Sequence, residues 1–101
     1  MEKMKYEFVA KTYQYSSSEE MTGWIFVSLP KELSKEIREN FKHLEVGWGR
    51  MKVIAKLGSS EWQTSIWFDT KQNAYLLPLK AKIRAQEKVA LGEDVQVSIQ
   101  V

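Results

Sequence analysis

The sequence predicts a mainly β protein with one or two short helices, folded as a small barrel whose two halves are similar. Apolar and polar residues alternate in several segments, which is typical of strands with one buried face. One series also occurs twice, in residues 24–57 and 74–101: an apolar run ending in Leu-Pro, a charged helical stretch containing Ile-Arg, a glycine and an alternating strand. Because strands leave exposed edges unless they are paired or closed, a barrel with a pseudo-two-fold axis within one chain is the economical arrangement.

The first predicted elements are two strands and the clearer helix. Residues 4–11 alternate between apolar and polar positions, whereas residues 24–29 are apolar at nearly every position, as in a strand covered on both faces. Pro30 suits the first turn of a helix, because the backbone N–H that it lacks would have no partner there. The helical stripe expected to face the core consists of Leu33, Ile37, Phe41 and Leu44.

The remaining predicted elements are four strands and a short helix, separated by turns rich in glycine and polar residues. The strands are expected at residues 50–57, 62–69, 74–79 and 93–101, and the short helix at residues 80–88. In the last strand, the side chains expected in the core are those of Val95, Val97, Ile99 and Val101. The sequence thus predicts six strands, one clear helix and one short helical stretch.

Length and composition indicate one soluble domain over residues 1–101. A chain of this length buries roughly two-thirds of its unfolded surface, so it needs no disulfide, and it contains no cysteine. The N-terminal residues lack the apolar segment of a signal peptide, and no stretch approaches the roughly 20 apolar residues of a spanning helix. We therefore expect a cytoplasmic protein that does not bind membranes.

Four spaced motifs cover nearly the whole chain from Phe8 onward. They are Trp24-x-Phe26-Val27-x-Leu29-Pro30, Trp62-x-Thr64-Ser65-Ile66, Tyr75-x-Leu77-Pro78-Leu79-x-x-x-Ile83-Arg84 and Leu91-Gly92-x-Asp94-Val95-x-Val97. This ordered set resembles a small prokaryotic family that is known only as a domain of unknown function and that also occurs fused ahead of YdeI/OmpD-associated domains. The resemblance implies a double-split β-barrel, the architecture of the AbrB and MazE DNA-binding proteins, and it implies no established activity.

A looser similarity concerns the second half alone. Residues 76–84, followed by residues 91–95, are similar to the AbrB half-barrel pattern, in which a strand ends in Ile-Pro, a helix carries Ile-Arg and Gly-Asp opens the last strand. Here Leu77 precedes the proline, and Glu93 separates the glycine from the aspartate. AbrB proteins build their barrel from two chains, whereas this chain supplies both halves, so we expect a monomer or a weak dimer.

The sequence predicts no catalytic residue, no metal site and no cofactor. His43 is the only histidine and there is no cysteine, so a histidine-rich or Cys–His metal site cannot be built. His43 lies near the end of the polar helix, where a surface histidine is the better interpretation. The chain also has no glycine-rich phosphate loop. We therefore expect a protein that is not an enzyme.

Basic side chains gather around the short second helix. Residues 71–90 carry a local charge of +4, although the whole chain carries only +2. The candidate contacts to an anion or to nucleic acid are Lys80, Lys82, Arg84 and Lys88. Basic residues also line the polar face of one strand, namely Arg50, Lys52 and Lys56. The alternative is that these charges solvate a barrel surface and that Arg84 binds backbone carbonyls at the barrel end. The low net charge favours that alternative, so nucleic acid is not the favoured partner.

Aromatic residues offer a third possibility, a pocket for a small molecule lined by Trp24, Trp62, Trp67 and Tyr75. Trp67 shares the outer face of its strand with Gln63, Ser65 and Asp69, which makes it a candidate exposed aromatic contact. The overall prediction is a non-enzymatic binding or accessory domain with an unknown partner. Its alternatives are an AbrB-like nucleic-acid module that uses the basic second helix and a small-molecule-binding barrel.

Overall fold

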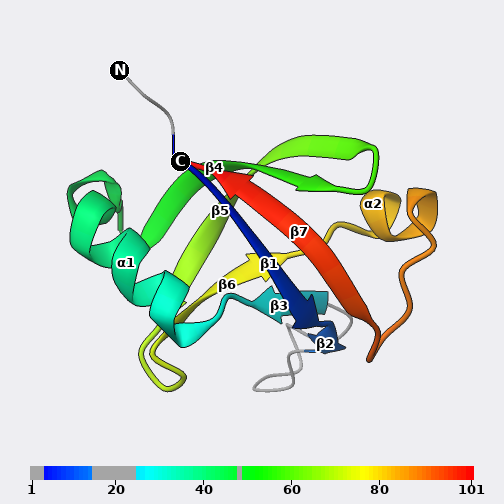
Figure 1. Ribbon diagram of the computed structural model, residues 1–101, viewed down its shortest axis with the longest axis horizontal. Helices are drawn as coiled ribbons and strands as arrows, with labels where there is room; N and C mark the ends of the chain where they lie inside the picture. The colour runs from blue at the N-terminus through cyan, green and yellow to red at the C-terminus, as the bar shows by residue number, and fades with distance from the viewer. Residues whose placement is uncertain (1–3, 15–24, 48) are drawn as a thin grey trace.

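Seven antiparallel strands form one strongly curled sheet in the computed structural model, which describes residues 4–14, 25–47 and 49–101 (Figure 1). The strands are β1 (Lys5–Lys11), β2 (Tyr13–Gln14), β3 (Ile25–Ser28), β4 (Arg50–Leu57), β5 (Ser60–Asp69), β6 (Ala74–Pro78) and β7 (Asp94–Gln100). Two short α-helices, α1 (Lys31–Phe41) and α2 (Ala81–Gln86), and one 3₁₀ helix, η2 (Lys42–Leu44), complete the described elements. The predicted class, mainly β with short helices, is confirmed.

The sheet curls into a barrel because two long stretches of chain each change their pairing partner. The strand order is β1-β7-β4-β5-β6-β3-β2, and the two outermost strands, β1 and β2, are separated in the chain only by Thr12. The N-terminal stretch therefore pairs with β7 before Thr12 and with β3 after it. Similarly, β5 pairs with β4 through residues 60–67 and with β6 through residues 67–69. The result is a curled antiparallel sheet that forms a β half-barrel.

Thr12 fixes the point at which the N-terminal stretch changes partner. Its side chain is buried, and its hydroxyl donates to the carbonyl of Ala90 and accepts from the amide of Gly92, both at 2.8 Å. Its own amide donates to the carbonyl of Glu93 at 3.0 Å. The alternation of residues 4–11 predicted β1 correctly but gave no sign of β2, because two residues are too few to show a period.

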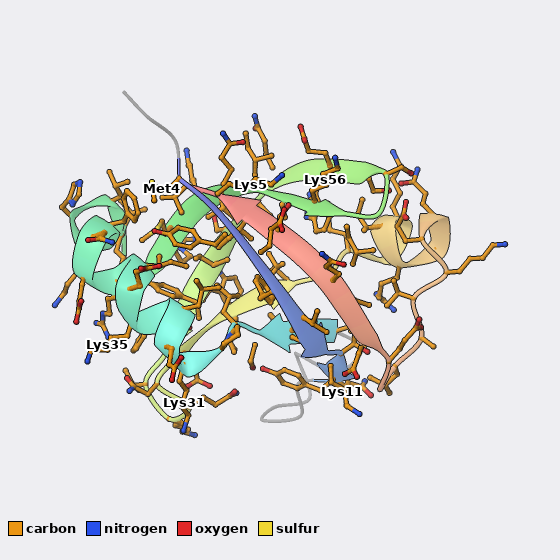
Figure 2. All side chains as sticks on the ribbon, in the orientation of Figure 1. Met4, Lys5, Lys11, Lys31, Lys35 and Lys56 are labelled. Atoms are coloured by element: carbon orange, nitrogen blue, oxygen red, sulfur yellow. The ribbon has the colours of Figure 1, made fainter. Side chains whose placement is uncertain are left out.

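The core lies inside the curl, where the alternating strands direct their apolar side chains. The inward positions of β4 and β7 are filled by Met51, Val53, Ala55, Leu57, Val95, Val97 and Ile99, all buried as predicted. Val101, predicted in the core with them, follows the end of β7 and is only half-buried against the core. Helix α1 adds Ile37, which is fully buried, while Leu33 and Phe41 are half-buried against the same core. Leu44 was wrongly assigned to this stripe: the helix ends at Phe41, and in the 3₁₀ turn that follows Leu44 is 48% exposed. Most charged side chains point outward, including the labelled lysines (Figure 2).

Strands β3 and β6 pair in a locally symmetric way about Val27 and Leu77. Phe26 lies opposite Pro78, as Leu76 lies opposite Ser28. The amide of Leu29 donates to the carbonyl of Tyr75, and correspondingly the amide of Leu79 donates to that of Ile25, both at 2.9 Å. The helices that follow also begin alike, after Pro30 and Lys80, which have nearly equal backbone angles.

This symmetry corrects the alignment of the repeated motifs. Pro30 corresponds in position to Lys80, because Pro30 is the cap of α1, whereas Pro78 is the last residue of β6. In the same register Ser34 corresponds to Arg84, and the side chains of both donate to the carbonyl that precedes their helix, Ser34 to Leu29 and Arg84 to Leu79. Matching the two Leu-Pro pairs was therefore wrong by two residues. The repeat of the complete halves stays a prediction.

In the described part of the chain, no helix is both long enough and apolar enough to cross a membrane.

Candidate functional site

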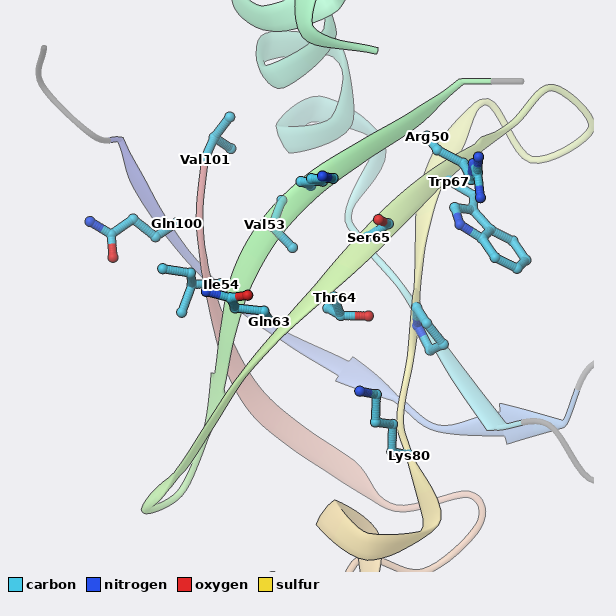
Figure 3. Close-up of a pocket in the computed structure, with 12 residues that line it drawn as sticks. Arg50, Val53, Ile54, Gln63, Thr64, Ser65, Trp67, Lys80, Gln100 and Val101 are labelled. Carbon is cyan, nitrogen blue, oxygen red and sulfur yellow. The ribbon is translucent and has the colours of Figure 1, made fainter. Parts of the chain in front are cut away.

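A groove of about 690 Å³ crosses the outer face of β4 and β5 (Figure 3). We call it the β4–β5 groove. It is lined by Arg50, Lys52, Val53, Ile54, Gln63, Thr64, Ser65, Trp67, Pro78, Lys80, Gln100 and Val101. Its far wall exists because β6 pairs with β5 only from Trp67 to Asp69 and then runs along β3, so that Pro78 and Lys80 stand apart from the middle of β5.

Three cations surround the groove, and two of them come from one strand. Met51 and Val53 of β4 point into the core, so alternation turns Arg50 and Lys52 outward. Lys80 reaches the groove from the opposite side, at the start of α2 (Figure 3). All three side chains are exposed, and within the described residues none of them forms an ion pair. No side chain that lines the groove is acidic, so the charged side chains of the lining are all positive.

Polar and aromatic side chains share the groove floor with these cations. In the β4–β5 register Lys52 lies opposite Ser65 and Ile54 lies opposite Gln63. Gln100 of β7 pairs with Ile54 from the other side and closes that end of the groove. The floor therefore offers amide and hydroxyl groups between the charged walls, which suits a ligand that both carries negative charge and forms hydrogen bonds.

Trp67 stands at one end of the groove, where β5 changes its partner from β4 to β6. It is opposite Arg50 in one register and opposite Leu76 in the other, and Figure 3 shows its indole beside the Arg50 side chain. The sequence placed Trp67 on the outer face with Gln63 and Ser65, and that is where it lies. It is half-buried rather than fully exposed, because its ring packs against Phe26 with centroids 6.1 Å apart.

The other aromatic candidates do not join Trp67. Tyr75 is fully buried in the core, and Trp62 is half-buried against the core and lines a different pocket, beside α2. Trp24 lies outside the described residues. Among the described aromatic side chains, only Trp67 lines the β4–β5 groove.

The predicted basic cluster around α2 is not one surface. Arg84 is half-buried, and its Nε donates to the carbonyl of Leu79 at 3.1 Å. This is the contact with a backbone carbonyl that the sequence offered as the alternative to ligand binding. Lys88 lies beyond the helix in a left-handed conformation (φ 54°), where its amide and that of Val89 cap α2. Lys80 and Lys82 both line the pocket beside α2, and of the four candidates only Lys80 also lines the β4–β5 groove.

Arg50 and Lys52 are the functional candidates that the sequence undervalued. Their alternation marked them as outward-facing, but it could not show that Lys80 faces them across β5. That relation depends on how β5 and β6 diverge, which is a long-range property of the sheet. Local charge density pointed to α2 instead.

A second polar cluster lies on the other side of β5, under α1. The hydroxyl of Tyr75 donates to Oε1 of Glu45 at 2.5 Å, and Nε of Arg38 lies 3.7 Å from the same oxygen. The Arg38 guanidinium also lies 3.8 Å above the Phe68 ring. Burial raises the pKa of Tyr75 well above its ordinary value of 10.0; the hydrogen bond and charge of Glu45 add to the rise, and Arg38 opposes it. The members satisfy one another, so this cluster ties η2 to the sheet.

Neither cluster resembles a metal centre or a catalytic pair. Among the described residues no group of three or more histidine, aspartate and glutamate side chains lies close enough to hold a metal ion. The lining of the β4–β5 groove includes hydroxyls and lysines but no histidine, aspartate or glutamate side chain that could act as a general base beside them.

Comparison with protein families matches residues 8–99 to a model described as "Domain of unknown function (DUF1905)". Comparison with curated proteins gives no match.

Proposed function

The chain belongs to the DUF1905 family of domains of unknown function, and from that premise we propose that it is a non-enzymatic binding module whose site is the β4–β5 groove. The observation that carries the proposal is the ring of three exposed cations, Arg50, Lys52 and Lys80, around a groove without an acidic side chain. The ligand of such a site is an anion.

Electrostatics supports this assignment. Like charges that face one another without counter-charges repel, and an anion between them relieves that repulsion and gains charge-assisted hydrogen bonds. The volume of about 690 Å³ also falls within the usual range of ligand sites, roughly 300–1,000 Å³. A surface that merely solvates the barrel would mix both signs of charge, as the exposed Lys5–Glu7 pair does on β1.

The alternative site centred on α2 has less support. A nucleic-acid surface there would need its basic side chains on one accessible face, yet Arg84 is engaged with Leu79 and Lys88 lies past the helix end. As part of the same proposal, the module acts in the cytoplasm as a monomer or a weak dimer, which suits a cysteine-free chain that supplies both halves of its barrel.

The test uses tripolyphosphate as a probe and the backbone amide signals of the protein in two-dimensional NMR. We expect saturable shifts in residues 50–54, 63–67 and 78–80. The double variant Lys52→Gln/Lys80→Gln should bind at least about tenfold more weakly, because two of the three charges are gone. Lys56→Gln is the control for position on the strand: Lys56 is exposed on the same face of β4 but does not line the groove. Shifts elsewhere on the barrel, or equal weakening by Lys56→Gln, would contradict the proposal.

A further inference from the structure

From the same groove we infer a ligand class: the β4–β5 groove binds single-stranded nucleic acid, with phosphates on its cations and a base against Trp67. This inference rests on the proposed function and narrows it. It is carried by the combination of separate cations, a fixed aromatic ring and neutral hydrogen-bonding groups in one groove.

The positions of the cations suit a chain of phosphates better than a single anion. Arg50 and Lys52 are two residues apart on the same face of β4, which separates them by about 7 Å along the strand. Lys80 stands on the opposite wall, beyond Thr64 and Ser65 (Figure 3). A compact anion cannot contact all three closely, whereas successive phosphates of a flexible strand can. Such contacts release counterions and give affinity that does not depend on sequence.

Trp67 supplies the surface for a base. Proteins that bind single strands without sequence preference combine a positive groove with aromatic side chains on which bases stack. Trp67 is held by Phe26 and remains partly exposed, so its ring is oriented before a ligand arrives. At the other end of the groove, Gln63 and Gln100 offer amides that can donate to or accept from any base edge.

A duplex fits this arrangement poorly. Its bases are stacked on one another and are not available to Trp67, and the protein carries a net charge of only +2. An acidic peptide matches the cations but brings no planar group to the exposed part of Trp67. A free mononucleotide has a base but too few phosphates to reach both walls. The single strand is the ligand that uses all the groups present.

The test is fluorescence anisotropy with a labelled ten-residue oligothymidylate, at salt concentrations from about 50 to about 200 mM. We expect micromolar binding at the lowest salt, with a log–log salt slope of about −2, since each phosphate contact on a single strand contributes about −0.7. Lys52→Gln/Lys80→Gln should weaken binding at least about tenfold and flatten the slope. Its control, Lys11→Gln/Lys31→Gln, has the same net charge and removes two exposed lysines outside the groove, so it should change affinity less than about twofold.

Trp67→Leu tests stacking separately and should weaken binding by about fivefold or more. A thermal melt accompanies this variant, because Trp67 also packs against Phe26. Should Trp67→Leu fail to fold, the lysine pair decides the question, since both lysines are exposed.

Competing ligands separate this inference from the proposed function. Equal affinity for a ten-base-pair duplex, for thymidine monophosphate or for decaglutamate would overturn single-strand binding, as would tripolyphosphate binding in the groove without any binding of the oligothymidylate. The last result would leave the anion-binding proposal intact. Failure of every anion to bind would overturn both.

Discussion

At the scale of single residues, the structure shows polar groups that are buried because each has a specific partner. Ser34 is fully buried in α1; its hydroxyl accepts from the amide of Tyr75 at 3.0 Å and donates to the carbonyl of Leu29 at 3.5 Å. Tyr75 in turn donates its hydroxyl to Glu45. Unsatisfied, these groups would each cost about 1–3 kcal/mol; together they join α1, β6 and η2.

Tyr75→Phe should lower the free energy of unfolding by about 1.5–3 kcal/mol at neutral pH, because it removes a hydrogen bond to a carboxylate. The effect should depend on pH. The raised pKa keeps Tyr75 protonated in the folded protein, whereas in the unfolded chain it ionises near its ordinary value of 10.0. Its contribution to stability is therefore complete below pH 10 and is lost as the pH rises further.

Urea unfolding of wild type and variant, at about pH 8 and about pH 11, measures this difference. The free energy of unfolding of the wild type should fall more than that of Tyr75→Phe between the two values. An equal fall in both proteins would show that Tyr75 does not contribute to alkaline unfolding.

At the scale of elements, β7 is the strand that links β1 to β4, because it pairs with both. It pairs with β1 along its whole length and with β4 at its C-terminal end, and its inward side chains, Val95, Val97 and Ile99, are all buried. In the described sheet β7 lies between β1 and β4, which are not paired with each other.

A chain cut after Glu93 should therefore fail to fold. It forfeits three buried side chains worth about 1.5–3 kcal/mol each, and it leaves two strands with unpaired edges. That loss is comparable with the whole stability of a typical domain, about 5–15 kcal/mol. Circular dichroism should show no cooperative thermal transition, whereas a control chain that lacks only Val101 should still melt cooperatively. A cooperative melt of the shorter chain would mean that β7 is peripheral.

At the scale of the whole molecule, the sequence predicted what depends on local periodicity and missed what depends on pairing. Alternation correctly identified β1, β4 and β7 and their buried faces, because one-sided burial imposes a period of two. The shift that makes Lys80 rather than Pro78 the counterpart of Pro30 could not be read from motifs, since it is set by the β3–β6 register. The β4–β5 groove was missed for the same reason: Lys52 and Lys80 come together only where β5 and β6 diverge.

The pairing of β1 with β7 also determines how late in synthesis the sheet can be completed and how fast the domain folds. Lys5 lies opposite Gln100, and Val101 donates its amide to the carbonyl of Met4. Strands from opposite ends of the domain must therefore meet before the sheet is complete (Figure 1). During synthesis β1 therefore remains unpaired until nearly the whole domain has been made.

Proteins dominated by such distant contacts fold in milliseconds to seconds, and we expect stopped-flow refolding, followed by tryptophan fluorescence, to fall in that range. Refolding within microseconds would show that β1 pairs with β7 only after the rate-limiting step. Until β7 arrives, the exposed edge of β1 is open to other chains, so speed of synthesis as well as stability governs how much of this protein reaches its native state.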